Sequence, residues 1–228
     1  MLIKNTLTEI KSDLYHVQND IGESHRKAIE KNYTFAQKEY DMKIIGITGT
    51  LGAGKGTIVD YLTKNCGYRH YSVRGYLIEE AQRRGMELNR DTFVVVANDL
   101  RAKHSPSYIV DQLYNIALGN GTDAIIESIR TPGEVESLRR QEHFILIGVD
   151  ADPEIRYQRI VNRASETDHI SFETFIQNEQ REMESSDPNH QNIGKCMQMA
   201  DHVFMNNGDF DDLYSQIEDY FSLDKQDQ

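Results

Sequence analysis

Apolar residues recur with helical spacing near the start of the chain. Six of them are separated by alternating intervals of four and three residues: Ile3, Leu7, Ile10, Leu14, Val17 and Ile21. This spacing is typical of a helix that packs one face against another helix. After Gly22, residues 23–40 indicate a second helix with weaker periodicity. We therefore expect a helical extension over residues 1–41, which either folds onto the rest of the chain or associates with a protein partner or a second copy of the chain.

Beyond Lys43 the pattern changes to short apolar runs that alternate with helical segments. Strands that alternate with helices build a parallel sheet covered on both faces. Residues 42–228 are therefore predicted to form a three-layer α/β fold with a five-stranded parallel sheet. The expected strands are 43–48, 68–72, 124–127, 144–150 and 202–206, and the expected helices are 57–65, 91–104, 107–118, 172–183 and those that start near Pro132, Pro153 and Phe210.

The composition is that of an ordinary globular protein, with 38% apolar and 27% charged residues among 228. We see no secretory signal and no apolar run of the roughly 20 residues that cross a bilayer, so we expect a cytoplasmic protein without membrane contact. Cys66 and Cys196 lack metal-ligand spacing, which fits a reducing compartment. The net charge of −12 argues against a nucleic-acid partner. It does not argue against a nucleotide site, because the local field decides what a cleft binds.

A glycine-rich segment follows the strand predicted at residues 43–48. It has the G-x-x-x-x-G-K spacing of a P-loop, with Gly49, Gly54 and Lys55 at the marked positions. Glycines let such a loop curl so that its backbone N–H groups point at phosphates, and the lysine adds a mobile positive charge. We therefore expect residues 42–228 to adopt the P-loop NTPase type of α/β fold. We expect ATP to be bound by Gly49, Thr50, Leu51, Gly52, Ala53, Gly54, Lys55, Gly56 and Thr57.

The end of this loop departs from the general P-loop pattern. Gly56 holds the usual Ser/Thr position, and the hydroxyl follows one residue later on Thr57. A Gly-Lys-Gly-Thr ending resembles that of adenylate kinase and related nucleoside monophosphate kinases. The resemblance implies that Thr57 contacts a phosphate and that Mg²⁺ is held largely through water.

The resemblance extends through most of residues 43–221. Residues 125–131 resemble the strand-end motif of adenylate kinases, in which an acidic residue is followed by an arginine. This implies that Glu127 orients the water shell of the metal and that Arg130 binds the phosphate of the acceptor. Ligands of open parallel sheets bind outside the carboxyl ends of the strands, which agrees with both roles.

Residues 152–163 resemble the helix that leads into the lid of the same family. Arg159 and Arg163 are four residues apart and therefore share one helix face. The resemblance implies that both are catalytic and stabilise the transferring phosphate, with Arg156 as a weaker candidate. A short helical lid is expected over residues 164–186, with Arg181 directed back toward the site.

Residues 200–208 resemble the C-terminal strand and turn of dephospho-coenzyme A kinases. In those kinases the residues after the strand line the adenine pocket, which implies a base contact for Asn207 and Gly208.

The acceptor side departs from the adenylate kinase pattern. That family has a Ser-Thr-Gly-Asp-x-x-Arg stretch whose arginine binds the acceptor phosphate, and here Ile78 occupies the arginine position. Arg74 and Arg101 are the candidates to replace it, and Ser72 and Arg130 are further candidates to bind the substrate.

The leading hypothesis is an ATP- and Mg²⁺-dependent phosphotransferase acting on a nucleoside or deoxynucleoside monophosphate. Some adenylate-kinase-like relatives precede a deoxycytidylate-deaminase-like domain, but the H-x-E and P-C-x-x-C motifs of that zinc site do not occur here. One alternative is an ATP-binding sensor with weak ATPase activity. Another is an enzyme similar to dephospho-coenzyme A kinase, whose hydroxyl acceptor needs a base such as Asp60, Glu79 or Asp99.

Overall fold

The computed structural model describes residue 31 and residues 42–141, 143–163 and 171–223. The expected helical extension over residues 1–41 lies outside these residues, apart from residue 31. Residues 164–170 of the expected lid also lie outside them.

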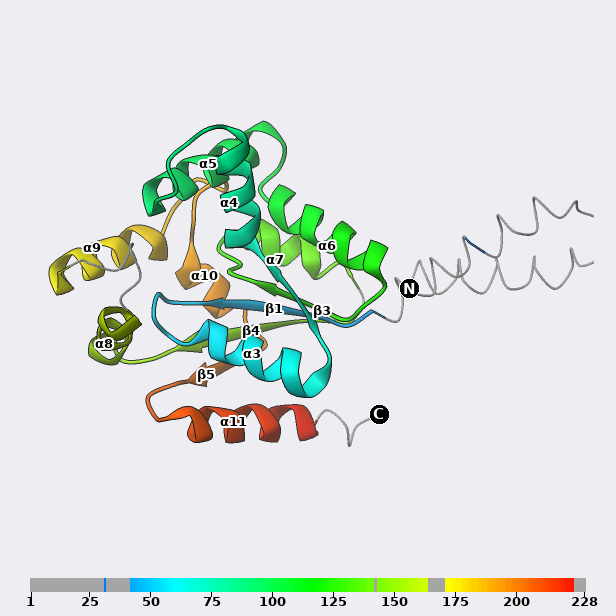
Figure 1. Cartoon of the computed structure of the whole chain (residues 1–228), viewed down its shortest axis with the longest axis vertical. Coiled ribbons are helices and arrows are strands. Elements are labelled where there is room, and N and C mark those ends of the chain that lie inside the picture. Colours follow the sequence, from blue (N-terminus) through cyan, green and yellow to red (C-terminus); the bar gives the residue numbers. More distant parts are fainter. Residues whose placement is uncertain (1–30, 32–41, 142, 164–170, 224–228) are drawn as a thin grey trace, which may run out of the picture.

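Five parallel strands form the sheet at the centre of the fold (Figure 1). Their order across the sheet is β2-β3-β1-β4-β5, so the strand that leads into the P-loop lies in the middle. This confirms the predicted α/β fold with a five-stranded parallel sheet. The strands are β1 (Ile44–Gly49), β2 (Arg69–Ser72), β3 (Ala124–Glu127), β4 (Phe144–Asp150) and β5 (His202–Met205).

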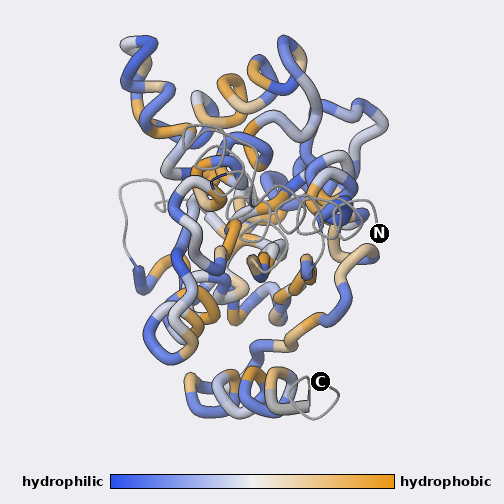
Figure 2. The backbone as a smooth tube through the Cα atoms, turned by 90° about the vertical axis from the view of Figure 1, so that its right-hand side faces the viewer, coloured by the Kyte–Doolittle hydropathy of each residue, from blue (hydrophilic) through white to orange (hydrophobic). Residues whose placement is uncertain are grey.

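Helices cover both faces of the sheet because successive strand residues point to opposite sides. In β1, Ile44 belongs to the core beneath α4 to α7 and α10, whereas Ile45 belongs to the core beneath α3 and α11. The apolar segments accordingly gather along the strands and the inward sides of the helices (Figure 2). The helices are α3 (Lys55–Cys66), α4 (Val73–Arg83), α5 (Arg90–Lys103), α6 (Tyr108–Asn120), α7 (Pro132–Leu138), α8 (Pro153–Arg163), α9 (Phe172–Met183), α10 (Ile193–Gln198) and α11 (Phe210–Leu223).

Two of these helices, α4 and α10, are absent from the sequence prediction. The signal for α4 is nevertheless present in the chain. Ser72 caps the helix by accepting a hydrogen bond from the Gly75 amide at 3.1 Å. Val73, Leu77 and Ala81 follow at intervals of four residues and are all buried. The helix starts directly after β2, so the second strand and this helix form one continuous wall of the site described below.

Among the described residues, no helix combines the length and the apolar character that crossing a bilayer requires.

Candidate nucleotide site

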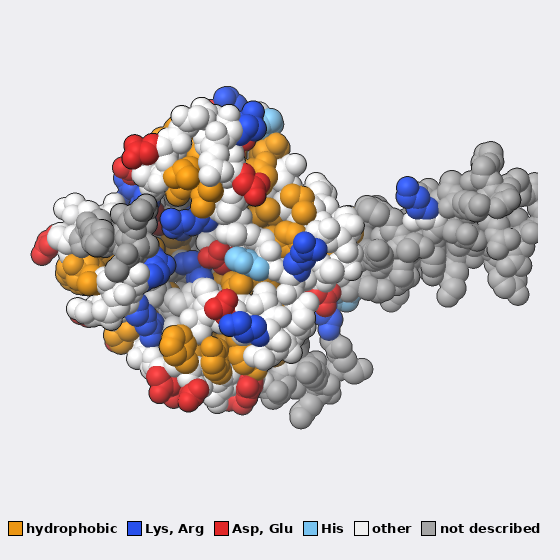
Figure 3. Space-filling model, in the orientation of Figure 1, with side chains coloured by type: hydrophobic (Ala, Val, Ile, Leu, Met, Phe, Trp, Pro, Cys, Tyr) orange, Lys and Arg blue, Asp and Glu red, His pale blue; other side chains and the backbone are white. Residues whose placement is uncertain are grey.

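A cavity of about 980 Å³ opens at the carboxyl ends of β1, β2 and β3. The P-loop and α3 form one side of it, α4 and α5 form the other, and residues of α8 and α9 also line it. In the space-filling view, Lys and Arg side chains gather in a hollow of the surface (Figure 3). The chain is acidic overall, so this hollow is a local concentration of positive charge that suits an anionic ligand.

The P-loop has the backbone conformation that its glycines predict. Gly49 and Gly54 have φ values of +145° and +104°, which side chains rarely adopt. Space excludes a side chain as well, since a Cβ at Gly49 would lie 2.2 Å from the Val149 carbonyl oxygen. A Cβ at Gly54 would lie 2.2 Å from Asn206 Nδ2. Both glycines are therefore required for the loop to curl.

Side-chain hydrogen bonds between the P-loop and other elements fix the position of the loop. Thr50 Oγ1 donates a hydrogen bond to Asp150 Oδ1 at 2.6 Å, Asn206 Nδ2 donates to the Ala53 carbonyl at 2.8 Å, and Arg156 Nη1 donates to the Leu51 carbonyl at 3.3 Å. Thr50 and Ala53 are buried and, like Gly49, do not line the cavity. The predicted loop residues therefore divide into a supporting set and a lining set, the latter comprising Leu51, Gly52, Gly54, Lys55, Gly56 and Thr57.

Lys55 is folded back onto its own loop. Its Nζ donates to the carbonyl oxygens of Gly49 and Thr50 at 2.9 and 2.8 Å. Burial and the nearby charge of Arg130 together lower the pKa of Lys55 from 10.5 to about 8, although the charge of Glu127 partly opposes this shift. A ligand phosphate would replace the two carbonyl oxygens with a full negative charge.

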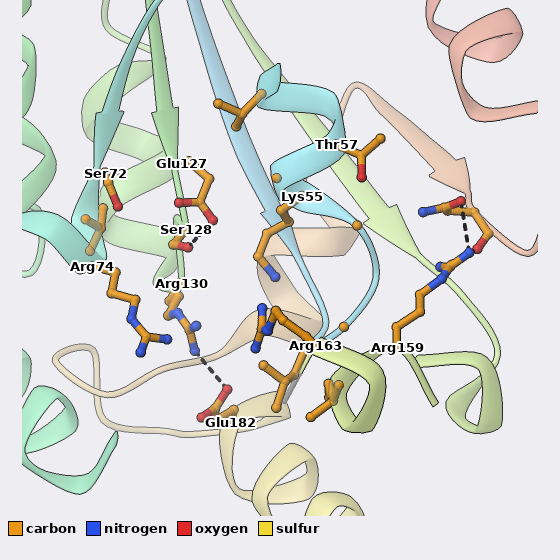
Figure 4. A pocket seen from close by; sticks show the side chains of 18 of the residues that line it. Lys55, Thr57, Ser72, Arg74, Glu127, Ser128, Arg130, Arg159, Arg163 and Glu182 are labelled. Carbon is orange, nitrogen blue, oxygen red and sulfur yellow. Dashed lines mark hydrogen bonds and ion pairs between the residues drawn. The ribbon is translucent and has the colours of Figure 1, made fainter. Parts of the chain in front are cut away.

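Glu127 lies at the end of β3, next to a residue with an unusual backbone. Ser128 has φ of +73°, and its Oγ donates to Glu127 Oε1 at 2.6 Å (Figure 4). Burial raises the pKa of Glu127, but hydrogen bonds from His70 and Ser128 and the charge of Lys55 outweigh it and lower this pKa to about 2. Strained backbone of this kind is common at ligand sites. Glu127 is therefore an ionised carboxylate held in a fixed position.

The predicted metal residues fit a magnesium ion by their chemistry. Thr57 and Glu127 both line the cavity, and a hydroxyl and an ionised carboxylate are the hard oxygen donors that Mg²⁺ prefers. No group of three or more His, Cys, Asp or Glu side chains is arranged for metal binding within the described ranges. Magnesium would therefore take most of its ligands from nucleotide phosphates and water.

The two arginines of α8 point in different directions (Figure 4). Arg163 extends toward Lys55, whereas Arg159 turns away to the segment after β5. Arg159 donates to the carbonyl oxygens of Asn206 and Gly208 at 2.8 and 3.1 Å. The shared helix face predicted a shared position for the two side chains, but the carbonyl groups of this segment bind the Arg159 guanidinium, so the two side chains diverge.

Two further arginines of this region lie outside the cavity lining. Arg156 is buried, lies 2.8 Å from Glu179 of α9 and donates to the Ala151 carbonyl, so it joins the P-loop, the segment after β4 and α9. Arg181 is 53% exposed and lies 3.5 Å from Asp91.

In the segment after β5, the asparagine that lines the cavity is one position earlier in the sequence than the predicted one. Asn207 is exposed, and its side chain accepts a hydrogen bond from the Asp152 amide at 2.8 Å, away from the cavity lining. Asn206 lines the cavity instead, because its amide turns inward to the Ala53 carbonyl. Gly208 also lines the cavity. Successive extended residues point to opposite sides, so a one-residue difference reverses the direction of the side chain.

The predicted acceptor residues all line the cavity, in two different states. Ser72 caps α4, and the Arg74 guanidinium lies 5.5 Å from the ring centroid of Phe93. Arg101 is only 1% exposed and is paired with Glu134 at 2.8 Å. Arg130 Nη1 donates to Glu182 and Gln191 at 2.8 and 2.7 Å. Arg101 thus lies in the wall of the cavity, whereas Arg130 lies at its surface.

Sequence reasoning missed three polar residues of this half: Arg90, Glu182 and Gln191. They come from α5, α9 and the segment before α10, and no motif joins them. Of the bases proposed for a hydroxyl acceptor, Asp60 lines the cavity. Glu79 and Asp99 do not, and Asp99 is paired with Arg84 and Lys103.

Comparison with known proteins agrees with this fold and loop. The family model AAA_18, described as an AAA domain, matches residues 45–187. A UPF0200 protein of Methanococcus vannielii is 31% identical over 179 residues, which cover 77% of this chain and 93% of the relative. The UPF0200 protein MMP1282 of Methanococcus maripaludis is 29% identical, covering 79% and 96%. Among solved structures, TT1252 of Thermus thermophilus aligns with a TM-score of 0.53 at 18% identity, covering 79% of this chain and 97% of that one.

Proposed function

The chain belongs to the AAA_18 family of P-loop domains and to the UPF0200 family, and we propose that it is an ATP-dependent phosphotransferase acting on a nucleoside or deoxynucleoside monophosphate. One observation carries the proposal: a single cavity contains the P-loop on one side and Arg74, Arg90 and Arg130 on the other. Transfer of a phosphoryl group requires a donor and an acceptor held in line, with positive charge around the group that moves.

On the donor side, Lys55 and the loop amides bind the triphosphate, and Arg163 neutralises the transferring group. Arg159 and the Asn206 to Gly208 segment are suited to the base end of ATP, since they lie beyond the loop from Arg130. Thr57 and Glu127 would hold Mg²⁺ through its water ligands, and the ion would supply positive charge that neutralises the donor phosphates.

Two carboxylates of the cavity, Glu127 and Glu182, are poorly suited to deprotonate a hydroxyl acceptor. A hydroxyl acceptor needs a base with a pKa near neutrality. The pKa of Glu127 is lowered to about 2, so this carboxylate is a weak base. Burial raises the pKa of Glu182, but the charges of Arg130 and Arg90 outweigh burial and lower it, which weakens this carboxylate as a base too. A phosphate acceptor needs no base, whereas a hydroxyl acceptor such as that of dephospho-coenzyme A would depend on Asp60, the proposed base that lines the cavity.

The second candidate is a nucleotide sensor that binds ATP and hydrolyses it slowly. Ile78 favours it, because this residue packs against the apolar core at a position where adenylate kinases carry an arginine. A sensor requires the donor half of the cavity alone, so the two candidates differ in whether any acceptor is phosphorylated.

The test is phosphate transfer from ATP in the presence of Mg²⁺. The eight common ribonucleoside and deoxyribonucleoside monophosphates and dephospho-coenzyme A are offered one at a time, and products are separated by ion-exchange chromatography. We expect a diphosphate product from at least one monophosphate, and none from the Lys55→Ala variant. ATP binding without transfer to any acceptor would replace the proposal with the sensor, and transfer to dephospho-coenzyme A alone would replace the acceptor class.

A further inference from the structure

The half of the cavity opposite the P-loop contains a charged network that no motif predicts. Glu182, near the end of α9, accepts one hydrogen bond on each carboxylate oxygen. Arg90 Nη2 lies 2.5 Å from its Oε1, and Arg130 Nη1 lies 2.8 Å from its Oε2. The Glu182 side chain is 5% exposed, and all three residues line the cavity. One buried anion therefore engages two arginines that lie 40 positions apart in the sequence.

Both arginines keep hydrogen-bonding capacity beyond this carboxylate. Arg90 Nε is buried and has no hydrogen-bond partner among the described residues. Within the same part of the chain, the side-chain hydrogen bonds of Arg130 run from Nη1, to Glu182 and Gln191. A guanidinium carries five N–H groups in a planar fork, so the network leaves donors for a ligand.

Arg101 adds a third guanidinium to this wall. It pairs with Glu134, while its Nη1 is buried without a hydrogen-bond partner among the residues that the structure describes. Arg90, Arg101 and Arg130 carry three positive charges against the two negative charges of Glu134 and Glu182. Buried donors without partners cost free energy, and an anionic ligand would satisfy them.

The position of Arg90 also accounts for the missing arginine of α4. Ile78 packs against the apolar core and offers no charge to the cavity. Arg90 is the first residue of α5, which packs against α4. The neighbouring helix thus supplies a positive charge that position 78 does not, in addition to that of Arg74 on α4.

We propose that Arg90 and Arg130 bind the anionic group of the phosphate acceptor, and that Glu182 is a built-in counter-anion with which this group competes. The inference rests on the proposed phosphotransferase function and assigns its acceptor to phosphomonoesters, which carry up to two negative charges. A neutral acceptor gains too little from the two arginines to compete with a buried carboxylate that both already bind. A dianion interacts more strongly with both, so Glu182 makes this half of the cavity selective for dianionic groups.

The inference is tested with inorganic phosphate as the probe. The whole chain is first saturated with Mg²⁺ and the non-hydrolysable ATP analogue AMPPNP, so that the P-loop is filled, and phosphate is then titrated calorimetrically. Glu182→Gln removes the competing charge at nearly constant shape and should lower the dissociation constant of phosphate about tenfold. Arg90→Met should raise it about tenfold. The matched control is Arg83→Met, which removes an exposed arginine of α4 and should leave phosphate binding unchanged.

Two results would overturn the inference. Unchanged or weaker phosphate binding by Glu182→Gln would refute the competition, and unchanged binding by Arg90→Met would refute the anion site. AMPPNP affinity reports whether each variant is folded. If Glu182→Gln does not fold, Glu182→Asp, which shortens the side chain by one methylene, should tighten phosphate binding in the same sense. Phosphate binding with the expected signs, but no transfer to any monophosphate, would refute the proposed function and leave the anion site standing.

Discussion

The two halves of the cavity differ in the groups that form them, backbone in one half and side chains in the other. The half proposed to bind the donor is built around nine consecutive residues, 49–57, whose backbone forms the loop and whose glycines allow its curvature. The half proposed to bind the acceptor contains four arginines from separate segments: Arg74, Arg90, Arg101 and Arg130. Arg101 pairs with Glu134, and both Arg90 and Arg130 pair with Glu182. A backbone cradle is specified locally, whereas an arrangement of guanidinium groups is specified only by the complete fold.

This difference predicts different responses to substitution. In the donor half, no other residue can take over the role of a lost one, because each backbone amide and each glycine with positive φ has its own position in the loop. In the acceptor half, several arginines share the positive charge, so the loss of one is partly compensated by the others.

Lys55→Ala should produce the largest effect in the molecule. Lys55 Nζ donates to two carbonyl oxygens of the P-loop, and the substitution removes the cation that we propose contacts the donor phosphates. We expect a decrease of at least about 100-fold in phosphate transfer, measured as kcat/KM for ATP. Lys64→Ala is the control, since Lys64 is an exposed lysine of the same helix. Transfer that survives Lys55→Ala would mean that the loop is not the donor site.

Gly54→Ala separates the backbone contribution from the charge. The substitution forces a side chain into a φ of +104° and against Asn206 Nδ2. We expect the free energy of unfolding to fall by about 1–3 kcal/mol, together with a loss of ATP binding, measured by urea denaturation and calorimetry. Gly56→Ala is the matched control for stability, because a Cβ at Gly56 meets nothing within 4 Å. Equal stability of the two variants would contradict the strained cradle.

The same difference explains how much the sequence could predict. The sheet and the P-loop follow from patterns contained in short segments, such as the apolar run before Gly49 and the lysine after Gly54. Each of these signals depends on neighbours in the chain. They are therefore visible without knowledge of the fold.

The acceptor half could be predicted only in part, because its contacts join distant segments. Arg101 and Arg130 both carry positive charge in the sequence, yet one is buried against Glu134 and the other meets Glu182 at the cavity surface. Glu182 and Arg90 are 92 residues apart, and no local pattern relates them. Asn206 and Asn207 differ only in the direction of a side chain, which the end of β5 decides.

The two arginines of α8 allow a sharper test of where the donor half ends. Arg163 extends toward Lys55, so Arg163→Ala should lower kcat about tenfold or more, with little change in the KM for ATP. Arg159 is bonded to the segment after β5, so Arg159→Ala should chiefly raise the KM for ATP. Steady-state kinetics with each variant distinguish the two roles. Equal effects on kcat would show that both arginines reach the transferring phosphate.

The smallest expected effect is a dependence of ATP binding on pH. Burial lowers the pKa of Lys55 to about 8, so free protein loses this charge as the pH rises through 8. Bound phosphates favour the charged lysine and raise its pKa, so binding above pH 8 takes up a proton. Between pH 7.5 and 8.5 the affinity for ATP should fall about threefold.

Calorimetry at pH 8.5 in two buffers with different ionisation enthalpies measures this proton uptake directly, and at pH 6.5 the uptake by Lys55 should vanish. The linkage to folding has the same origin. Because the pKa of Lys55 is lower in the folded chain than the 10.5 of the free side chain, stability without ligand should rise with pH between about 8 and 10.5. An affinity for ATP that stays constant from pH 7.5 to 8.5 would show that the lysine of the empty loop is not buried enough to lower its pKa. The backbone cradle would then bind phosphate beside a fully charged lysine, and the donor half would rely on side-chain charge as much as the acceptor half does.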